Sequence, residues 1–201
     1  MGRAGMLVFW EQRLAILATP KTGSTAIEAA LESLAALSIQ RPPVLKHTNV
    51  ARFHRFVGPY LEAAAGGPFT VVALMREPRD WLGSWFRYRS RDDILDGAKS
   101  TQGMSFDTFV KAWCALPRPT FADVGSQAQF LKGADRQKPD KIFRYENIGQ
   151  FVDFLEDRLD FQIFLPQLNV SPKAPLNLST GTLNRLKTVA AEDFELYDSL
   201  D

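Results

Sequence analysis

Hydrophobic and polar positions form blocks of two kinds along the chain, and the two kinds alternate. Short apolar runs predict strands over residues 7–10, 14–18, 44–46, 69–75 and 141–144. Apolar positions at helical spacing predict helices over residues 24–37, 50–65, 78–89, 105–116, 125–131 and 148–159, and from residue 180 onward. Strands that alternate with helices are typical of a parallel sheet with helices on both faces. We therefore expect an α/β fold.

The segment Thr19–Thr25 places a lysine, a glycine and several hydroxyls between an expected strand and an expected helix. This order forms a cradle for phosphate, because the first amides of a helix lack intrahelical acceptors and the helix dipole adds positive charge there. Nucleoside triphosphatases have the order G-x-x-x-x-G-K-[ST], whereas here Lys21 precedes Gly23, the only glycine of the segment. The segment predicts an anion site that is not a Walker A loop.

A second polar group follows the apolar run 69–75, which has the composition of a strand buried on both faces. Arg76 stands at the carboxyl end of this expected strand, and Pro78 fits the first position of a helix. Ser84 then lies about two turns into that helix. Ligands of open α/β sheets lie at the carboxyl edge, where an arginine and a hydroxyl can clamp a second phosphate.

These two motifs resemble those of sulfotransferases that use 3′-phosphoadenosine 5′-phosphosulfate (PAPS). Residues 20–25 resemble the 5′-phosphosulfate loop, the spacing of Arg76, Pro78 and Ser84 resembles the 3′-phosphate motif, and the tail is similar to the bacterial and carbohydrate-type members. The resemblance implies a P-loop-type central parallel sheet in a three-layer α/β/α arrangement, with PAPS as co-substrate and PAP as product. The cofactor-binding residues that it implies here are Pro20, Lys21, Thr22, Gly23, Ser24, Thr25, Arg76 and Ser84.

The resemblance extends to two later segments. Tyr145 begins a Tyr-Glu-Asn element whose tyrosine commonly contacts the nucleotide in the family; the alternative is a tyrosine packed at the sheet edge. Lys173 lies in a segment similar to the family's late loop, which often brings a basic side chain to the 3′-phosphate. The chain departs from the small-molecule members at Ala26 and Ile27, where those members often place an aromatic residue against adenine.

Sulfuryl transfer needs a cation at the leaving phosphate and a base for the acceptor proton. Lys21 is the candidate cation, because a fixed positive charge there stabilises the leaving oxygen. His47, expected at the end of the strand 44–46, is the candidate base, since a neutral imidazole removes protons near neutral pH. The alternatives are a non-catalytic histidine and Glu28 as a reserve carboxylate, although helix-face packing or a surface pair suits Glu28 better. His54 is expected to be structural or at the surface.

Bulk composition narrows the class of protein further. The 201 residues, 45% of them hydrophobic, suffice for one domain over residues 1–201, and a net charge of +1 argues against a nucleic-acid partner. The single cysteine, Cys114, lies in an apolar pattern and leaves no disulfide or cysteine-based zinc cluster. We expect no metal, no stable membrane insertion and a cytoplasmic location. The acceptor, a small molecule or carbohydrate, and the oligomeric state are not encoded in readable motifs.

Two other function classes stay open at this point. A kinase or nucleotide hydrolase of related fold would need the Gly-Lys-Ser/Thr order and an acidic magnesium ligand, neither of which is evident. A nucleotide-binding module without catalysis is disfavoured by the joint presence of Lys21 and His47. Replacement of Lys21 by alanine distinguishes this module from an enzyme, because an enzyme loses turnover whereas a binder only binds more weakly.

Overall fold

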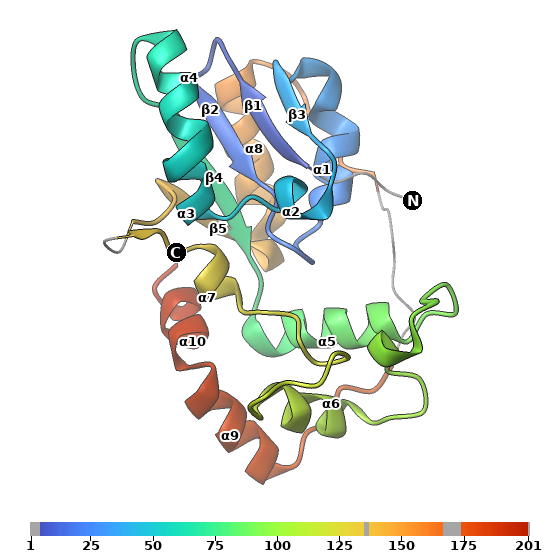
Figure 1. Cartoon of the computed structure of the whole chain (residues 1–201). Helices are drawn as coiled ribbons and strands as arrows, with labels where there is room; N and C mark the ends of the chain where they lie inside the picture. The colour runs from blue at the N-terminus through green and yellow to red at the C-terminus, as the bar shows by residue number, and fades with distance from the viewer. Residues whose placement is uncertain (1–4, 135–136, 167–173, 201) are drawn as a thin grey trace. The chain divides into compact units, whose positions relative to one another are not determined.

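The computed structural model describes residues 5–134, 137–166 and 174–200, which divide between two compact units. The first unit comprises residues 1–76, 127–169 and 200–201, and the second comprises residues 77–126 and 170–199. The chain thus leaves the first unit after Arg76 and re-enters it at Gln127. Figure 1 shows the sheet within the first unit.

The first unit is built on a five-stranded mixed sheet of order β3-β1-β2-β4-β5. The strands are β1 (Met6–Phe9), β2 (Leu14–Leu17), β3 (Leu37–Ile39), β4 (Thr70–Met75) and β5 (Lys141–Arg144). Strands β2, β4 and β5 are mutually parallel, whereas β1 runs antiparallel to both β2 and β3. The α/β class is confirmed, and the parallel arrangement that we expected holds only for the three strands β2, β4 and β5.

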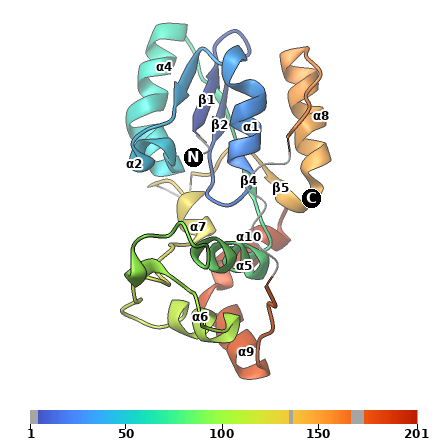
Figure 2. The same cartoon turned by 90° about the vertical axis from the view of Figure 1, so that its right-hand side faces the viewer.

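Helices cover both faces of this sheet. The helices of the first unit are α1 (Ser24–Leu31), α2 (Pro43–Lys46), α3 (Val50–Arg52), α4 (Gly58–Ala65), α7 (Gln127–Phe130) and α8 (Ile148–Leu159), with the short turns η1 (Glu32–Leu34), η2 (Phe53–Val57, a π-helix) and η5 (Tyr145–Asn147). Alternate strand residues such as Leu14 and Ile16 pack with Ile27 of α1 and Phe151 of α8 in one core. Helix α4 lies on the opposite side of the sheet (Figure 2).

The segment between α1 and α3 differs from the expectation. Residues 44–46 form helix α2, not a strand, because Pro43 occupies a first-turn position where its missing N–H costs no hydrogen bond. The expected helix 24–37 ends earlier, at α1 and η1, and its last residue Leu37 begins β3 instead. Pairing with the open edge of β1 stabilises this strand against the local helical pattern, since Leu37 lies opposite Val8.

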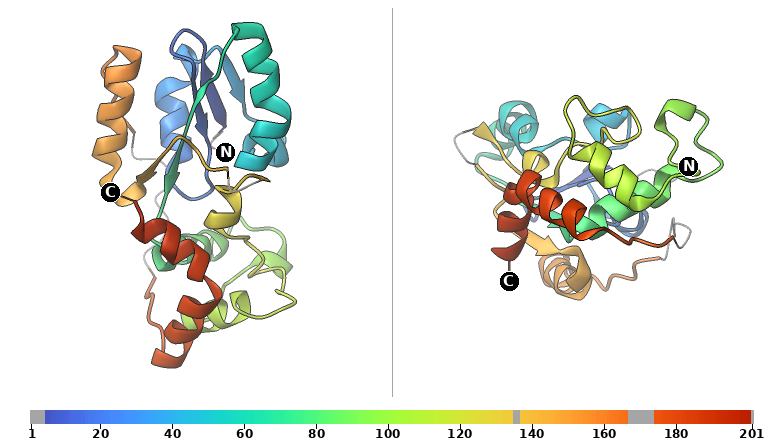
Figure 3. Two further views of the ribbon diagram at one scale, coloured as in Figure 1. Left: turned by 90° about the vertical axis from the view of Figure 1, so that its left-hand side faces the viewer. Right: turned by 90° about the horizontal axis from the view of Figure 1, so that it is seen from below.

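In its described part, the second unit consists of helices around a separate core. They are α5 (Pro78–Arg89), the 3-10 turn η3 (Gly97–Lys99), α6 (Phe106–Trp113), α9 (Thr180–Val189) and α10 (Ala191–Asp198), seen from two further sides in Figure 3. Trp81, Phe86 and Phe109 are buried in this core, and so is Cys114, as the sequence predicts. Among the described residues, no helix has both the length and the apolar character that crossing a membrane requires.

Candidate functional site

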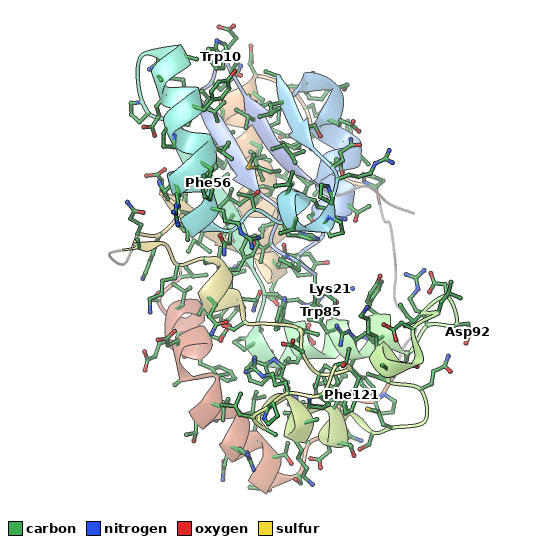
Figure 4. The ribbon with its side chains drawn as sticks, in the orientation of Figure 1. Trp10, Lys21, Phe56, Trp85, Asp92 and Phe121 are labelled. Carbon is green, nitrogen blue, oxygen red and sulfur yellow. The ribbon has the colours of Figure 1, made fainter. Side chains whose placement is uncertain are left out.

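Three polar segments meet the carboxyl ends of the three neighbouring parallel strands in the first unit. The loop 18–23 follows β2, Arg76 follows β4, and Tyr145 follows β5. Because parallel strands end at the same edge of a sheet, these segments share one edge. Figure 4 shows Lys21 at this end of the unit and Trp10 at the opposite end.

The loop after β2 has an unusual backbone. Lys21 and Gly23 both have positive φ values, +68° and +75°. A side chain with a β-carbon rarely adopts this conformation, and such residues concentrate at functional sites because the surrounding structure must hold them in place. Here the Thr22 hydroxyl donates a hydrogen bond to the carbonyl oxygen of Thr19 at 2.9 Å, and both threonine side chains are buried. The buried Thr22 hydrogen bond therefore holds the loop in this conformation, while Lys21 stays partly exposed.

The N-terminus of α1 is suited to an anion. Gly23 is its N-cap residue and provides no side-chain cap, and the first turn holds no acidic residue. The first N–H groups of the helix and its partial positive charge are then available to a negatively charged ligand. Ser24 and Thr25 stand in this first turn, half-buried, and add two hydroxyls.

Arg76 and Tyr145 contact the loop directly. The guanidinium carbon of Arg76 lies 4.8 Å from the centre of the Tyr145 ring, and its Nη1 donates a long hydrogen bond of 3.4 Å to the carbonyl oxygen of Lys21. The Tyr145 ring also covers Gly23, since a β-carbon built there would lie 3.0 Å from Cε2. Lys21, Gly23, Arg76 and Tyr145, which the sequence assigned separately, thus form one cluster.

His47 is held beside the same loop. Its Nδ1 lies 2.8 Å from the carbonyl oxygen of Ala18, so Nδ1 is the protonated nitrogen that donates, and the neutral ring keeps the Nε2 lone pair. Burial lowers the pKa of His47 below 6.5; the bond to Ala18 opposes this shift, and Lys46 adds to it. The residue follows helix α2 and not a strand, which corrects the expected position while keeping the side chain at the loop.

One further side chain of this edge was not predicted from the sequence. Gln127 is fully buried, accepts a hydrogen bond from the Arg76 N–H at 2.9 Å and donates one to the Arg76 carbonyl oxygen at 2.7 Å. The only signal in the sequence is a glutamine at the start of a short apolar helical pattern, which is typical of many surface positions. Its role depends on a residue 51 positions away.

Among the other candidate residues, Pro20 is half-buried in the loop itself. Ser84 is buried on α5 in the second unit, and Lys173 lies outside the described residues. Glu28 is buried on α1, which removes the surface pair considered for it. Within the described ranges, no three His, Cys, Asp or Glu side chains gather as a metal site requires. The roles of Ser84 and Lys173 stay predictions.

Comparisons with known proteins add no assignment to this geometry. No protein-family model, no curated protein and no solved structure matches the chain.

Proposed function

We propose that this chain is a PAPS-dependent sulfotransferase of the bacterial and carbohydrate-type branch, with a P-loop-type sheet in a three-layer α/β/α arrangement. The observation that supports this best is the cluster of Lys21, Gly23, Arg76 and Tyr145 at the carboxyl edge of three parallel strands, with His47 bound to the same loop. A cationic loop, an arginine and a base at one edge are the parts that transfer of a charged group requires.

The proposal gives each part of the edge a role in binding. The loop 20–25 and the N-terminus of α1 bind the 5′-phosphosulfate, because both present donors and positive charge. Arg76, with Ser84 and Lys173, binds the 3′-phosphate, and a guanidinium suits this because it donates two parallel hydrogen bonds. Tyr145 contacts the nucleotide from the end of β5.

The reaction moves a sulfuryl group from the bridging phosphate oxygen of PAPS to the oxygen or nitrogen of an acceptor. The hydroxyl or amine of a small-molecule or carbohydrate acceptor attacks the sulfur, while the bond from sulfur to the bridging phosphate oxygen breaks and its electron pair stays on PAP. Lys21 stabilises the charge that grows on this leaving oxygen. The Nε2 atom of His47 takes the acceptor proton, and its neutral form is favoured because burial lowers the pKa of the ring.

Isothermal titration of the purified protein with PAP, with ADP as the control, tests the proposal. PAP carries its second phosphate on the 3′-oxygen of the ribose, whereas ADP carries it on the 5′-phosphate. Tight PAP binding with weak ADP binding supports the role of Arg76 and leads directly to acceptor screening with PAPS. Equal or reversed affinities would overturn the proposal and favour a kinase or hydrolase with an unusual loop.

Turnover with PAPS separates an enzyme from a nucleotide-binding module that lacks catalysis. An enzyme converts PAPS to PAP when a suitable acceptor is present. A nucleotide-binding module binds PAP and PAPS but forms no PAP from PAPS. A cytoplasmic location and the absence of a metal requirement belong to the same proposal, and dialysis against a chelator before the assay tests the latter.

A further inference from the structure

The side-chain amide of Gln127 pairs with the main chain of Arg76 in the manner of a neighbouring strand. The Arg76 N–H donates to Oε1 and the Arg76 carbonyl oxygen accepts from Nε2, at 2.9 and 2.7 Å. Arg76 comes directly after the last residue of β4, so this pairing continues the ladder one step beyond the strand. Among neutral side chains of this length, only an amide offers both a donor and an acceptor in this geometry.

The pairing joins the first two of the places where the chain passes between the compact units. The chain leaves the first unit after Arg76 and returns to it at Gln127, and both residues belong to the first unit. Gln127 also begins α7, where its carbonyl oxygen accepts from the N–H of Leu131 at 2.9 Å. The glutamine is therefore anchored by its own helix turn, and Arg76 is held at its N–H and its carbonyl group.

A fixed main chain limits where the Arg76 side chain can point. The guanidinium reaches both the carbonyl oxygen of Lys21 and the face of Tyr145, which places it at the anion loop. An arginine with a free main chain would lose part of this preorganisation, because each rotatable bond that ligand binding must immobilise lowers the affinity. The two hydrogen bonds from Gln127 fix the Arg76 main chain before a ligand binds.

We infer that Gln127 is a positioning residue, which holds the main chain of Arg76 and thereby sets the preference of the protein for a nucleotide with a 3′-phosphate. This inference rests on the proposed function, since it assigns the 3′-phosphate to Arg76. The two hydrogen bonds join the side chain of Gln127 to the main chain of Arg76, and through them Gln127 acts on the arginine to which the proposal assigns the ligand.

The test compares the affinities of PAP and adenosine 5′-phosphate (AMP), which differ only in the 3′-phosphate, by isothermal titration. In Q127M, which keeps the size of the side chain and removes both hydrogen bonds, we expect the ratio of the AMP to the PAP dissociation constant to fall about tenfold. We expect AMP affinity itself to change less than about twofold, since the 5′-phosphate is bound by the loop and α1.

D140A is the matched control. Asp140 accepts a hydrogen bond from the N–H of Val71 at 2.6 Å, so it also anchors the main chain of β4, but near the amino end of the strand. We expect D140A to lower the thermal midpoint and to leave the AMP to PAP ratio unchanged. Should Q127M fail to fold, Q127E replaces it, because the carboxylate still accepts from the Arg76 N–H and loses only the bond to the Arg76 carbonyl oxygen.

Each outcome distinguishes the inference from the proposed function. A wild-type protein that prefers PAP while the folded Gln127 variant keeps the same ratio would overturn the positioning role and leave the proposed function standing. An equal fall of the ratio in D140A would also overturn it, since the effect would then be general destabilisation. A wild-type protein with no preference for PAP over AMP would overturn both.

Discussion

The Nδ1 atom of His47 lies 2.8 Å from the carbonyl oxygen of Ala18, and this pairing decides which ring nitrogen can accept a proton. In the neutral ring Nδ1 carries the hydrogen, so the lone pair is on Nε2. Ala18 immediately precedes Thr19, so the His47 ring is bonded to the loop 18–23 itself. A single main-chain contact thus couples the position of the candidate base to that of the loop 18–23.

The pH dependence of turnover tests this assignment. Burial lowers the pKa of His47 below its ordinary value of 6.5, so the neutral ring predominates above that pH and the ring is protonated as the pH falls through the lowered pKa. We expect kcat/KM to be constant above about pH 6.5 and to fall below it, with a midpoint under 6.5. The stability that His47 contributes follows the same direction: it is complete above pH 6.5 and is lost as pH falls through the lowered pKa.

H47A provides the comparison at a fixed pH. We expect kcat to fall by roughly a hundredfold or more, with PAP affinity nearly unchanged, because the ring acts on the acceptor proton. H54A is the control on the other histidine, which lies in the π-helical turn η2, and its kcat and pH profile should match the wild type. An acid limb that survives in H47A would assign the base to another residue.

Lys21 combines the charge to which the proposal assigns a catalytic role with a strained main chain. We expect K21A to lower kcat by roughly two to three powers of ten, because a preorganised cation at the leaving oxygen is removed. K21G removes the same ammonium group but adopts the φ of +68° without a β-carbon. Its unfolding free energy should exceed that of K21A by about 1 kcal/mol, measured by denaturant titration. Weakened PAP binding with unchanged kcat in both variants would contradict the catalytic role.

At the scale of the elements, the anion loop depends on what packs over it. The N-cap of α1 is Gly23, and Cε2 of the Tyr145 ring lies 3.0 Å from the point where a β-carbon would stand. The loop comes from the end of β2 and the tyrosine from the end of β5, which are separated in the sheet by β4. The shape of this turn therefore depends on two elements that are distant in sequence.

Alanine at Gly23 separates backbone strain from this packing. Gly66, the C-cap of α4, has a similar φ of +68° against +75° for Gly23, and a β-carbon there would meet nothing within 4 Å. We expect G66A to lower the unfolding free energy by about 1 kcal/mol from conformation alone. G23A should cost more and should also weaken PAP binding, because the new methyl group displaces Tyr145. Equal destabilisation by the two variants would show that the ring moves freely.

The elements also show where sequence patterns suffice and where they fail. The bounds of α5, β5 and α8 agree with the predicted ranges, because Pro78, the short apolar run of β5 and the spacing of α8 are local signals. Strand β3 and helix α2 were predicted wrongly. Strand β3 forms by pairing with the edge of β1, which no local pattern can indicate. Helix α2 begins at Pro43, and a proline is equally compatible with a break between elements.

At the scale of the whole molecule, two hydrophobic cores of the described chain have separate membership. One core lies in the first unit and contains Leu14 and Phe151. The other lies in the second unit and contains Phe86 and Phe109. Each core therefore stabilises the elements of its own unit directly. The loss of one core weakens the other only through cooperativity between the units.

Hydrogen exchange on two core variants measures that cooperativity. F151A and F109A each remove a fully buried aromatic side chain, at a cost of about 3–5 kcal/mol. We expect F151A to speed exchange mainly in the sheet and α8, and F109A mainly in α5, α6 and α9. A uniform acceleration in both variants would contradict separate cores and would support the single domain predicted from chain length.

The sequence by itself determined the order of strand, anion loop and helix, the place of Arg76 after a buried strand, and the α/β class, because these follow from composition and spacing among near neighbours. Only the tertiary structure decided the antiparallel direction of β1 and β3, the ring of Tyr145 over Gly23, and the bond from His47 to Ala18. It also decided the pairing of Gln127 with Arg76. These features depend on contacts between distant segments, whose energy is set by the packed fold and leaves no periodic trace along the chain.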